Sequence, residues 1–114
     1  MHELSIAENI VEIAVAHLRA DGGSSVKEIE LEIGTLAGIE IDALTFAMDS
    51  ATKNTPLQNA EVRILTVQGR LRCDSCSVEF DANDFFQPCT SCGSFDNITL
   101  QGEEMRVKTL LVQE

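Results

Sequence analysis

Four cysteines in two C-x-x-C pairs constrain this 114-residue chain more than any other feature of its sequence. Cys73 and Cys76 form the first pair, Cys89 and Cys92 form the second, and twelve residues separate the pairs. Two such pairs let four thiolates surround one tetrahedral ion, because each two-residue gap makes a tight turn around the metal. Gly93 directly follows the second pair, where such a turn commonly needs a positive φ angle. The spacing therefore predicts a closed site that holds structural Zn(II) and leaves no position for a reacting water.

The segment around these cysteines, residues 70–99, lacks any regular hydrophobic periodicity. Four of the five phenylalanines of the chain lie in it, but few other apolar residues accompany them. A segment of about thirty residues rarely builds a sufficient hydrophobic core alone. Structural zinc contributes an apparent ~10–16 kcal/mol in finger peptides, which is comparable to the stability of a whole small domain. We therefore expect residues 70–99 to form an inserted zinc-binding domain that resembles a zinc ribbon.

Three other uses of the four cysteines compete with zinc. Two disulfides are disfavoured if the chain works in a reducing compartment. A thioredoxin-type redox pair requires a C-x-x-C that opens a helix after a strand, whereas the flanks of both pairs here are turn-like. Iron in a rubredoxin-like site would use the same four ligands, and the sequence leaves that alternative open.

Outside this segment the hydrophobic pattern alternates between helical and strand periods. Two amphipathic helices are predicted, over residues 3–20 and 41–51. Three strands are predicted, over residues 26–34, 60–69 and 105–112. The pattern predicts an α+β fold, in which two helices pack on a small three-stranded mixed sheet.

Charge along these strands indicates that they share one sheet. In the strand over residues 26–34, three glutamates alternate with Ile29, Leu31 and Ile33. Basic residues, Arg63 in the second strand and both Arg106 and Lys108 in the third, can pair with these glutamates across the sheet. Residues 1–69 and 100–114 are therefore predicted to form one α/β domain, interrupted by the zinc-binding domain at residues 70–99.

The chain is strongly acidic, with 8 basic and 19 acidic residues and a formal net charge of −11. Such a surface repels phosphate, which argues against nucleic acid and against anionic membranes as partners. No secretory signal is evident in the first twenty residues, and no apolar run approaches the ~18 residues that a membrane span needs. These features predict a cytoplasmic protein.

The amino terminus carries a second candidate metal site. His2 follows Met1, and its bulk is expected to keep Met1 in the mature chain. The α-amine of Met1, the backbone nitrogen and imidazole of His2, and the backbone nitrogen of Glu3 can occupy four corners of one plane. Square-planar nitrogen donors suit Ni(II) or Cu(II). The other histidine, His17, is predicted to lie on a helix without a metal-binding role.

Taken together, these features resemble the HypA/HybF family, the nickel metallochaperones of NiFe-hydrogenase maturation. The resemblance covers the whole chain. It rests on the opening MHELSIA, the stretch IELEIGTLAGIEIDALTFAMDSATKNTPLQNAEV, the two C-x-x-C pairs and the closing GEEMRVKTLLV. The second pair departs from a pattern common in such ribbons, since Thr90 follows Cys89 and Pro88 precedes it.

The resemblance implies a non-enzymatic nickel chaperone. It implies that His2 binds Ni(II) through its side chain, that Met1 and Glu3 contribute backbone nitrogens, and that the four cysteines bind Zn(II). It also implies two partners, the hydrogenase maturation GTPase and the large subunit of NiFe-hydrogenase, while a link to urease accessory proteins stays open. Two other hypotheses compete: a zinc-ribbon adaptor in which His2 is incidental, and an iron or redox protein that uses the cysteines.

Overall fold

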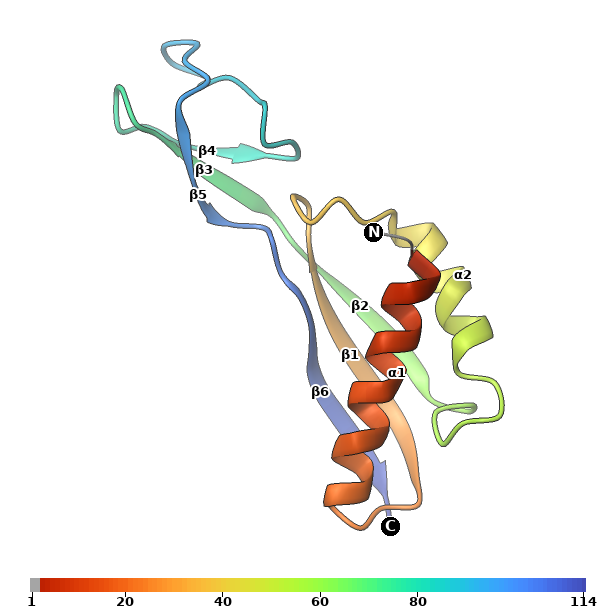
Figure 1. The fold of residues 1–114 in the computed structure, drawn as a ribbon. Coiled ribbons are helices and arrows are strands. Elements are labelled where there is room, and N and C mark those ends of the chain that lie inside the picture. Colours follow the sequence, from red (N-terminus) through yellow and green to blue (C-terminus); the bar gives the residue numbers. More distant parts are fainter. Residues whose placement is uncertain (1–2) are drawn as a thin grey trace. The chain divides into compact units, whose positions relative to one another are not determined.

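The computed structural model describes residues 3–114 and divides the chain into two compact units (Figure 1). The helices are α1 (Glu3–Ala20) and α2 (Ile41–Ala51). The strands are β1 (Ser25–Gly34), β2 (Glu61–Val67), β3 (Gly69–Cys73), β4 (Glu79–Ala82), β5 (Asn97–Gln101) and β6 (Met105–Gln113). The first unit holds the residues up to Leu31 together with Ile39–Leu65 and Arg106–Glu114, and the second holds Glu32–Gly38 and Thr66–Met105.

The first unit has the predicted architecture of two helices and a three-stranded sheet in the order β2-β1-β6. Figure 1 shows both helices beside this sheet. Helix α1 ends where Gly22 adopts a left-handed conformation, with φ of 73°. Its buried face is centred on Ile6 and Ile10, whereas Leu4, which the helical period placed on that face, is 44% exposed. The helical period was therefore predicted correctly, but the buried face of the helix is rotated by part of a turn from the predicted one.

Hydrogen bonds at the strand ends show how β1 and β6 are oriented in the sheet. The amide of Ser24 donates to the carbonyl of Gln113 at 2.9 Å, and that of Gly34 donates to the carbonyl of Glu104 at 2.8 Å. The beginning of β1 thus meets the end of β6 and its end meets the beginning of β6, so the two strands are antiparallel.

Strand β2 runs parallel to β1, with α2 in the connection between them. The amide of Thr35 donates to the carbonyl of Val67 at 3.0 Å, which joins the ends of both strands. Arg63 on β2 lies 3.1 Å from a carboxylate oxygen of Glu28 and 3.8 Å from one of Glu30. The predicted charge pairing across the sheet is confirmed for Arg63. Because these side chains are partly exposed, the pairs define register more than they add stability.

The second unit has a sheet of its own, in the order β4-β3-β5, with β3 antiparallel to both neighbours. These strands have only four or five residues each, which is too short for the hydrophobic pattern to predict them. One face of the sheet covers a small core of buried side chains, formed by Leu36, Leu71, Cys73, Phe80, Ala82 and Cys89. On the other face, Arg70 forms ion pairs with Asp81 and Glu79.

The segment Glu32–Gly38 packs in the second unit, although it lies far in sequence from the rest of that unit. The hydroxyl of Thr35 accepts a hydrogen bond from the amide of Gly69 at 2.8 Å and donates one to the carbonyl of Ala82 at 3.0 Å. Leu36 is buried in the core of that unit, and its amide donates to the carbonyl of Gly102 at 2.8 Å. A side chain at Gly34 would overlap the backbone of Gly102, so this close approach requires glycine.

None of the helices within residues 3–114 is long and apolar enough to span a membrane.

Candidate metal centre

The four cysteine sulfurs converge at one end of the second unit. The sulfur of Cys73 lies 3.5 Å from that of Cys92, and the sulfur of Cys76 lies 3.6 Å from that of Cys89. All four sulfurs lie within 4.8 Å of one another. A tetrahedral ion with bonds of about 2.3 Å to sulfur separates its ligand atoms by about 3.8 Å. The spacing of the sulfurs therefore matches a single tetrahedral ion, and no disulfide joins them.

The first C-x-x-C pair lies in a tight turn that follows β3. The amide of Cys73 donates to the carbonyl of Val78 at 2.9 Å, and the amide of Ser77 donates to the carbonyl of Cys73 at 2.9 Å. Ser77 has φ of 66°, a left-handed conformation that is uncommon for a residue other than glycine. This turn directs both sulfurs of the pair to the same side of the backbone.

The second pair repeats the same turn. The amide of Cys89 donates to the carbonyl of Ser94 at 2.8 Å, and the amide of Gly93 donates to the carbonyl of Cys89 at 2.9 Å. Gly93 has φ of 76°, as the sequence predicted, and corresponds to Ser77 in the first turn. The positive φ of Ser77 was not predicted, although aligning CDSCS with CTSCG would have indicated it.

Replacement of Gly93 tests how much the turn depends on this conformation. No atom lies within 4 Å of the position that a Cβ would take, so Gly93→Ala creates no clash and its cost comes from the backbone alone. We expect the variant to lose about 1 kcal/mol of stability. Ser77→Gly is the matched opposite change and should be neutral or slightly stabilising. Denaturant unfolding of the zinc-loaded proteins measures both, and equal stability of Gly93→Ala and wild type would contradict the expectation.

Further hydrogen bonds hold the turns together. The amide of Asp74 donates to the carbonyl of Asp96 at 2.9 Å, and the Ser75 and Ser94 hydroxyls lie 3.4 Å apart. The side-chain amide of Asn97 donates to the carbonyls of Gln87 and Ser94 at 3.2 and 3.3 Å. The positions of the four sulfurs are therefore determined by the hydrogen bonds that fix the two turns.

The protonation of the thiols differs within each pair. For Cys73, burial raises the pKa, but the amides of Cys76 and Ser75 together with the thiols of Cys92 and Cys76 outweigh it, and the net shift is downward. The amides of Cys92 and Ser91 lower the pKa of Cys89 to about 6. The first cysteine of each pair thus receives two amide donors and favours the thiolate, which is the form that binds metal.

The second cysteine of each pair holds its proton more tightly. The amide of Val78 lowers the pKa of Cys76. Burial and the neighbouring sulfurs of Cys89 and Cys73 raise it by more, so that the net pKa is about 12. The amide of Ser94 likewise lowers the pKa of Cys92, and the sulfur of Cys73 with burial raises it overall. Four thiolates at this separation repel one another, so a cation is needed to hold all four deprotonated. The donor set and its geometry fit Zn(II), and the same geometry would accept iron.

Few apolar side chains support this site. Of the four phenylalanines in residues 70–99, only Phe80 is buried, whereas Phe85, Phe86 and Phe95 are exposed. Cys73 and Cys89 are themselves part of the buried cluster. The ion and its ligands would therefore supply much of the core of this unit.

The nickel site predicted at the amino terminus falls mainly outside the described residues, because Met1 and His2 precede them. Glu3 is the first residue of α1. Its carboxylate accepts a hydrogen bond from the backbone amide of Glu40 at 3.4 Å, just before α2. His17 is exposed on α1, and no metal-binding group within residues 3–114 includes it.

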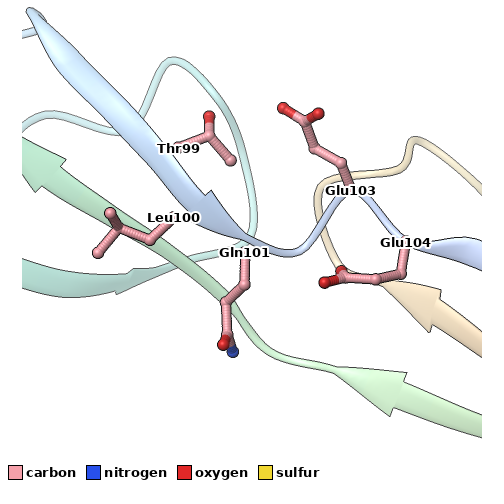
Figure 2. A pocket seen from close by; sticks show the side chains of 5 residues that line it. All are labelled: Thr99, Leu100, Gln101, Glu103 and Glu104. Atoms are coloured by element: carbon pink, nitrogen blue, oxygen red, sulfur yellow. The ribbon is translucent and has the colours of Figure 1, made fainter.

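A pocket of about 250 Å³ lies beside β5 in the second unit and is lined by Thr99, Leu100, Gln101, Glu103 and Glu104. Figure 2 shows the side chains of Glu103 and Glu104 pointing in different directions. The carboxylate of Glu104 accepts a hydrogen bond from the amide of Gly102 at 2.8 Å, which occupies one of its oxygens. Within the described part of the chain, the four cysteines are the group of side chains arranged to hold a metal ion.

Comparisons with known proteins agree on one family. A family model described as "HypA: Hydrogenase/urease nickel incorporation, metallochaperone, hypA" matches residues 1–112. The hydrogenase maturation factor HypA of Parabacteroides distasonis is 43% identical, over 100% of this chain and 99% of the relative. That of Geobacter metallireducens is 41% identical over 99% of this chain and 100% of the relative.

A solved structure shows the same fold. The solution structure of the Ni metallochaperone HypA from Helicobacter pylori superposes with a TM-score of 0.71 and covers 99% of this chain and 98% of its own. Its sequence is 23% identical, so this likeness concerns the fold.

Proposed function

Since the chain belongs to the HypA family of hydrogenase and urease nickel-incorporation metallochaperones, we propose that it binds Ni(II) at its amino terminus and delivers it to the large subunit of NiFe-hydrogenase. The proposed donors are the α-amine of Met1, the backbone nitrogen and imidazole of His2, and the backbone nitrogen of Glu3. The family consists of metallochaperones and not of enzymes, so the nickel is cargo.

The observation that supports this site most directly is that Glu3 lies in the first turn of α1. The first amides of a helix have no acceptor within it, so the amide of Glu3 can lose its proton to a metal without breaking a helical hydrogen bond. The partial positive charge of a helix amino terminus disfavours a dication. Two deprotonated amides would neutralise Ni(II), which removes most of that penalty.

The four cysteines are proposed to bind structural Zn(II). The support is the tetrahedral spacing of the sulfurs, the repeated turns and the small apolar core around them. On this proposal the nickel site belongs to the domain formed by residues 1–69 and 100–114, and the zinc site to residues 70–99. Metal analysis of purified protein tests the choice of ion, since a full equivalent of iron without zinc would contradict it.

The transfer of nickel requires partners of the hydrogenase pathway. We propose that the maturation GTPase and the hydrogenase large subunit act with this protein in the cytoplasm, and urease accessory proteins would be further candidates because the family description includes urease. The sequence contains no phosphate-binding glycine loop, so energy for release would come from the partner.

An amino-terminal extension provides the sharpest test of the nickel site. Native mass spectrometry with Ni(II) compares the untagged protein with a version that carries three extra residues before Met1. The extension converts the α-amine of Met1 into a peptide amide and moves His2 away from the second position of the chain. We therefore expect tight Ni(II) binding to disappear. Zinc content should be the same in both proteins. Equal nickel binding by both proteins would contradict the amino-terminal site.

A further inference from the structure

An apolar groove lies between α1 and α2 in the first unit. It has a volume of about 250 Å³ and is lined by Glu3, Leu4, Ala43, Phe46, Ala47 and Ser50. Phe46 is 76% exposed and Leu4 is 44% exposed, although both belong to well-formed helices. Single exposed apolar residues are common on protein surfaces. Two that flank a concave apolar surface are less so, and they are characteristic of binding sites.

The groove follows from the sequence of α2. Leu44 and Met48 are buried, which places Ala43, Ala47 and Ser50 along the side of the helix that borders α1. Small side chains at these positions leave space between α2 and the first turn of α1. Phe46 lies at the border of that space with most of its ring in solvent. Within residues 3–114, no segment of the chain covers it.

The surroundings of the groove are acidic. Asp42 and Asp49 lie four residues before and three residues after Phe46, so both neighbour it on the helix surface. Both are exposed, and neither forms an ion pair with a described residue. Glu3 adds a third carboxylate at the other wall. Helix α2 contains no basic residue, and the basic residues of α1 are confined to its last turn.

We infer that this groove is a docking surface for a partner protein that presents an apolar side chain flanked by lysine or arginine. The apolar side chain would pack between Leu4 and Phe46, and the basic residues would face Asp42 and Asp49. A second copy of this chain is a poor occupant, because both copies carry a net charge of −11. The groove includes Glu3, one of the proposed nickel donors, so a protein docked there would lie beside the cargo. This step rests on the proposed function.

Phe46→Ser tests the groove, with Phe86→Ser as the matched control because Phe86 is a similarly exposed phenylalanine, at 81%, in the second unit. The probes are the purified maturation GTPase and the hydrogenase large subunit of the same organism, with Kd measured by titration calorimetry against untagged protein. We expect Phe46→Ser to raise the Kd for at least one probe about tenfold or more, as for the removal of a central aromatic contact. Phe86→Ser should leave it unchanged.

The acidic rim is tested by the double variant Asp42→Asn, Asp49→Asn. Wild-type Kd should rise as sodium chloride is increased, and the double variant should bind more weakly at low salt with a flatter salt dependence. The inference is overturned if neither probe binds the wild type, if Phe46→Ser binds like the wild type, or if Phe86→Ser is equally weakened. A wild-type dimer that Phe46→Ser dissociates, seen by sedimentation, would identify a second copy as the occupant and would also overturn it.

Nickel binding separates this inference from the proposed function. Phe46→Ser should bind Ni(II) with the wild-type stoichiometry, because Phe46 is not among the proposed donors. Normal nickel binding with unaltered docking would reject the groove alone. A wild-type protein that binds no nickel would reject the proposed function, whatever the docking result.

Discussion

Removal of zinc should unfold the second unit and leave the helices of the first unit folded. The second unit buries few large side chains, and two of its six core residues, Cys73 and Cys89, are cysteines proposed to bind zinc. Structural zinc provides an apparent ~10–16 kcal/mol in finger peptides, which exceeds what so small a core can replace. Cys73→Ser should therefore lose zinc and lose dispersed amide signals of Thr66–Met105 in a proton–nitrogen NMR spectrum. Signals of α1 and α2 should persist.

The control for this experiment is Ser75→Ala, which changes an exposed residue of the same turn without removing a ligand. It should retain one equivalent of zinc and a native spectrum. If the protein keeps its full set of dispersed signals after a strong chelator has removed the metal, the ion is not the core of the unit. Loss of signals from α1 and α2 in Cys73→Ser would show that the two units do not unfold independently.

The zinc affinity should also depend on pH in a defined direction. Zinc binds thiolates, so every proton held by a thiol at the working pH must be released on binding. The pKa of Cys76 is raised to about 12, so its proton opposes binding throughout the neutral range and affinity rises with pH. Below pH 6 or so, Cys89, with its pKa lowered to about 6, also takes up a proton and affinity falls more steeply. Competition with a chromophoric chelator at several pH values measures this trend.

His2→Ala is expected to abolish tight nickel binding and to leave zinc content and fold unchanged. The imidazole is the side-chain donor in the proposed planar set, and it closes the chelate that holds the metal while the amides lose their protons. Removal of even an outer-shell partner of a metal ligand costs 10–100-fold in affinity, so loss of a ligand should cost at least about 100-fold. Calorimetric titration of Ni(II) into untagged protein measures the effect.

His17→Ala is the matched control, because His17 is the only other histidine of the chain. It lies exposed on α1, and its replacement should change neither nickel affinity nor stability by a measurable amount. A loss of nickel binding in His17→Ala comparable to that in His2→Ala would contradict the amino-terminal site. Unfolding of His2→Ala would instead assign that residue a structural role.

The hydrophobic period predicted the first unit well because its elements are long and have one buried face. Helix α1 begins and ends at the predicted residues, and so does α2. Glutamates that alternate with Ile29 and Leu31 made β1 recognisable, since every second side chain of a half-buried strand is apolar. Which side of α1 faces inward depends on the packing of neighbouring elements, so the exposure of Leu4 could not be predicted from spacing.

The second unit was predicted only as far as its cysteines, since local spacing determines the two turns that carry them. Its strands are too short to show a period, and Thr35 and Leu36 enter it from more than thirty residues away. Such long-range contacts leave no trace in a local pattern. The groove beside Phe46 was missed for a related reason, because the helical period identifies apolar positions but not whether another element covers them.

The path of the chain between the two units limits how the protein can be divided. The backbone passes from one unit to the other after Leu31, Gly38, Leu65 and Met105. A fragment confined to residues 66–105 would therefore lack the Thr35 hydroxyl that caps Gly69 and Ala82 and the Leu36 side chain that completes the core. Chimeras that exchange the zinc-binding part between relatives would have to transfer Glu32–Gly38 with it. Recombination at a single pair of crossover points would separate two segments that fold as one.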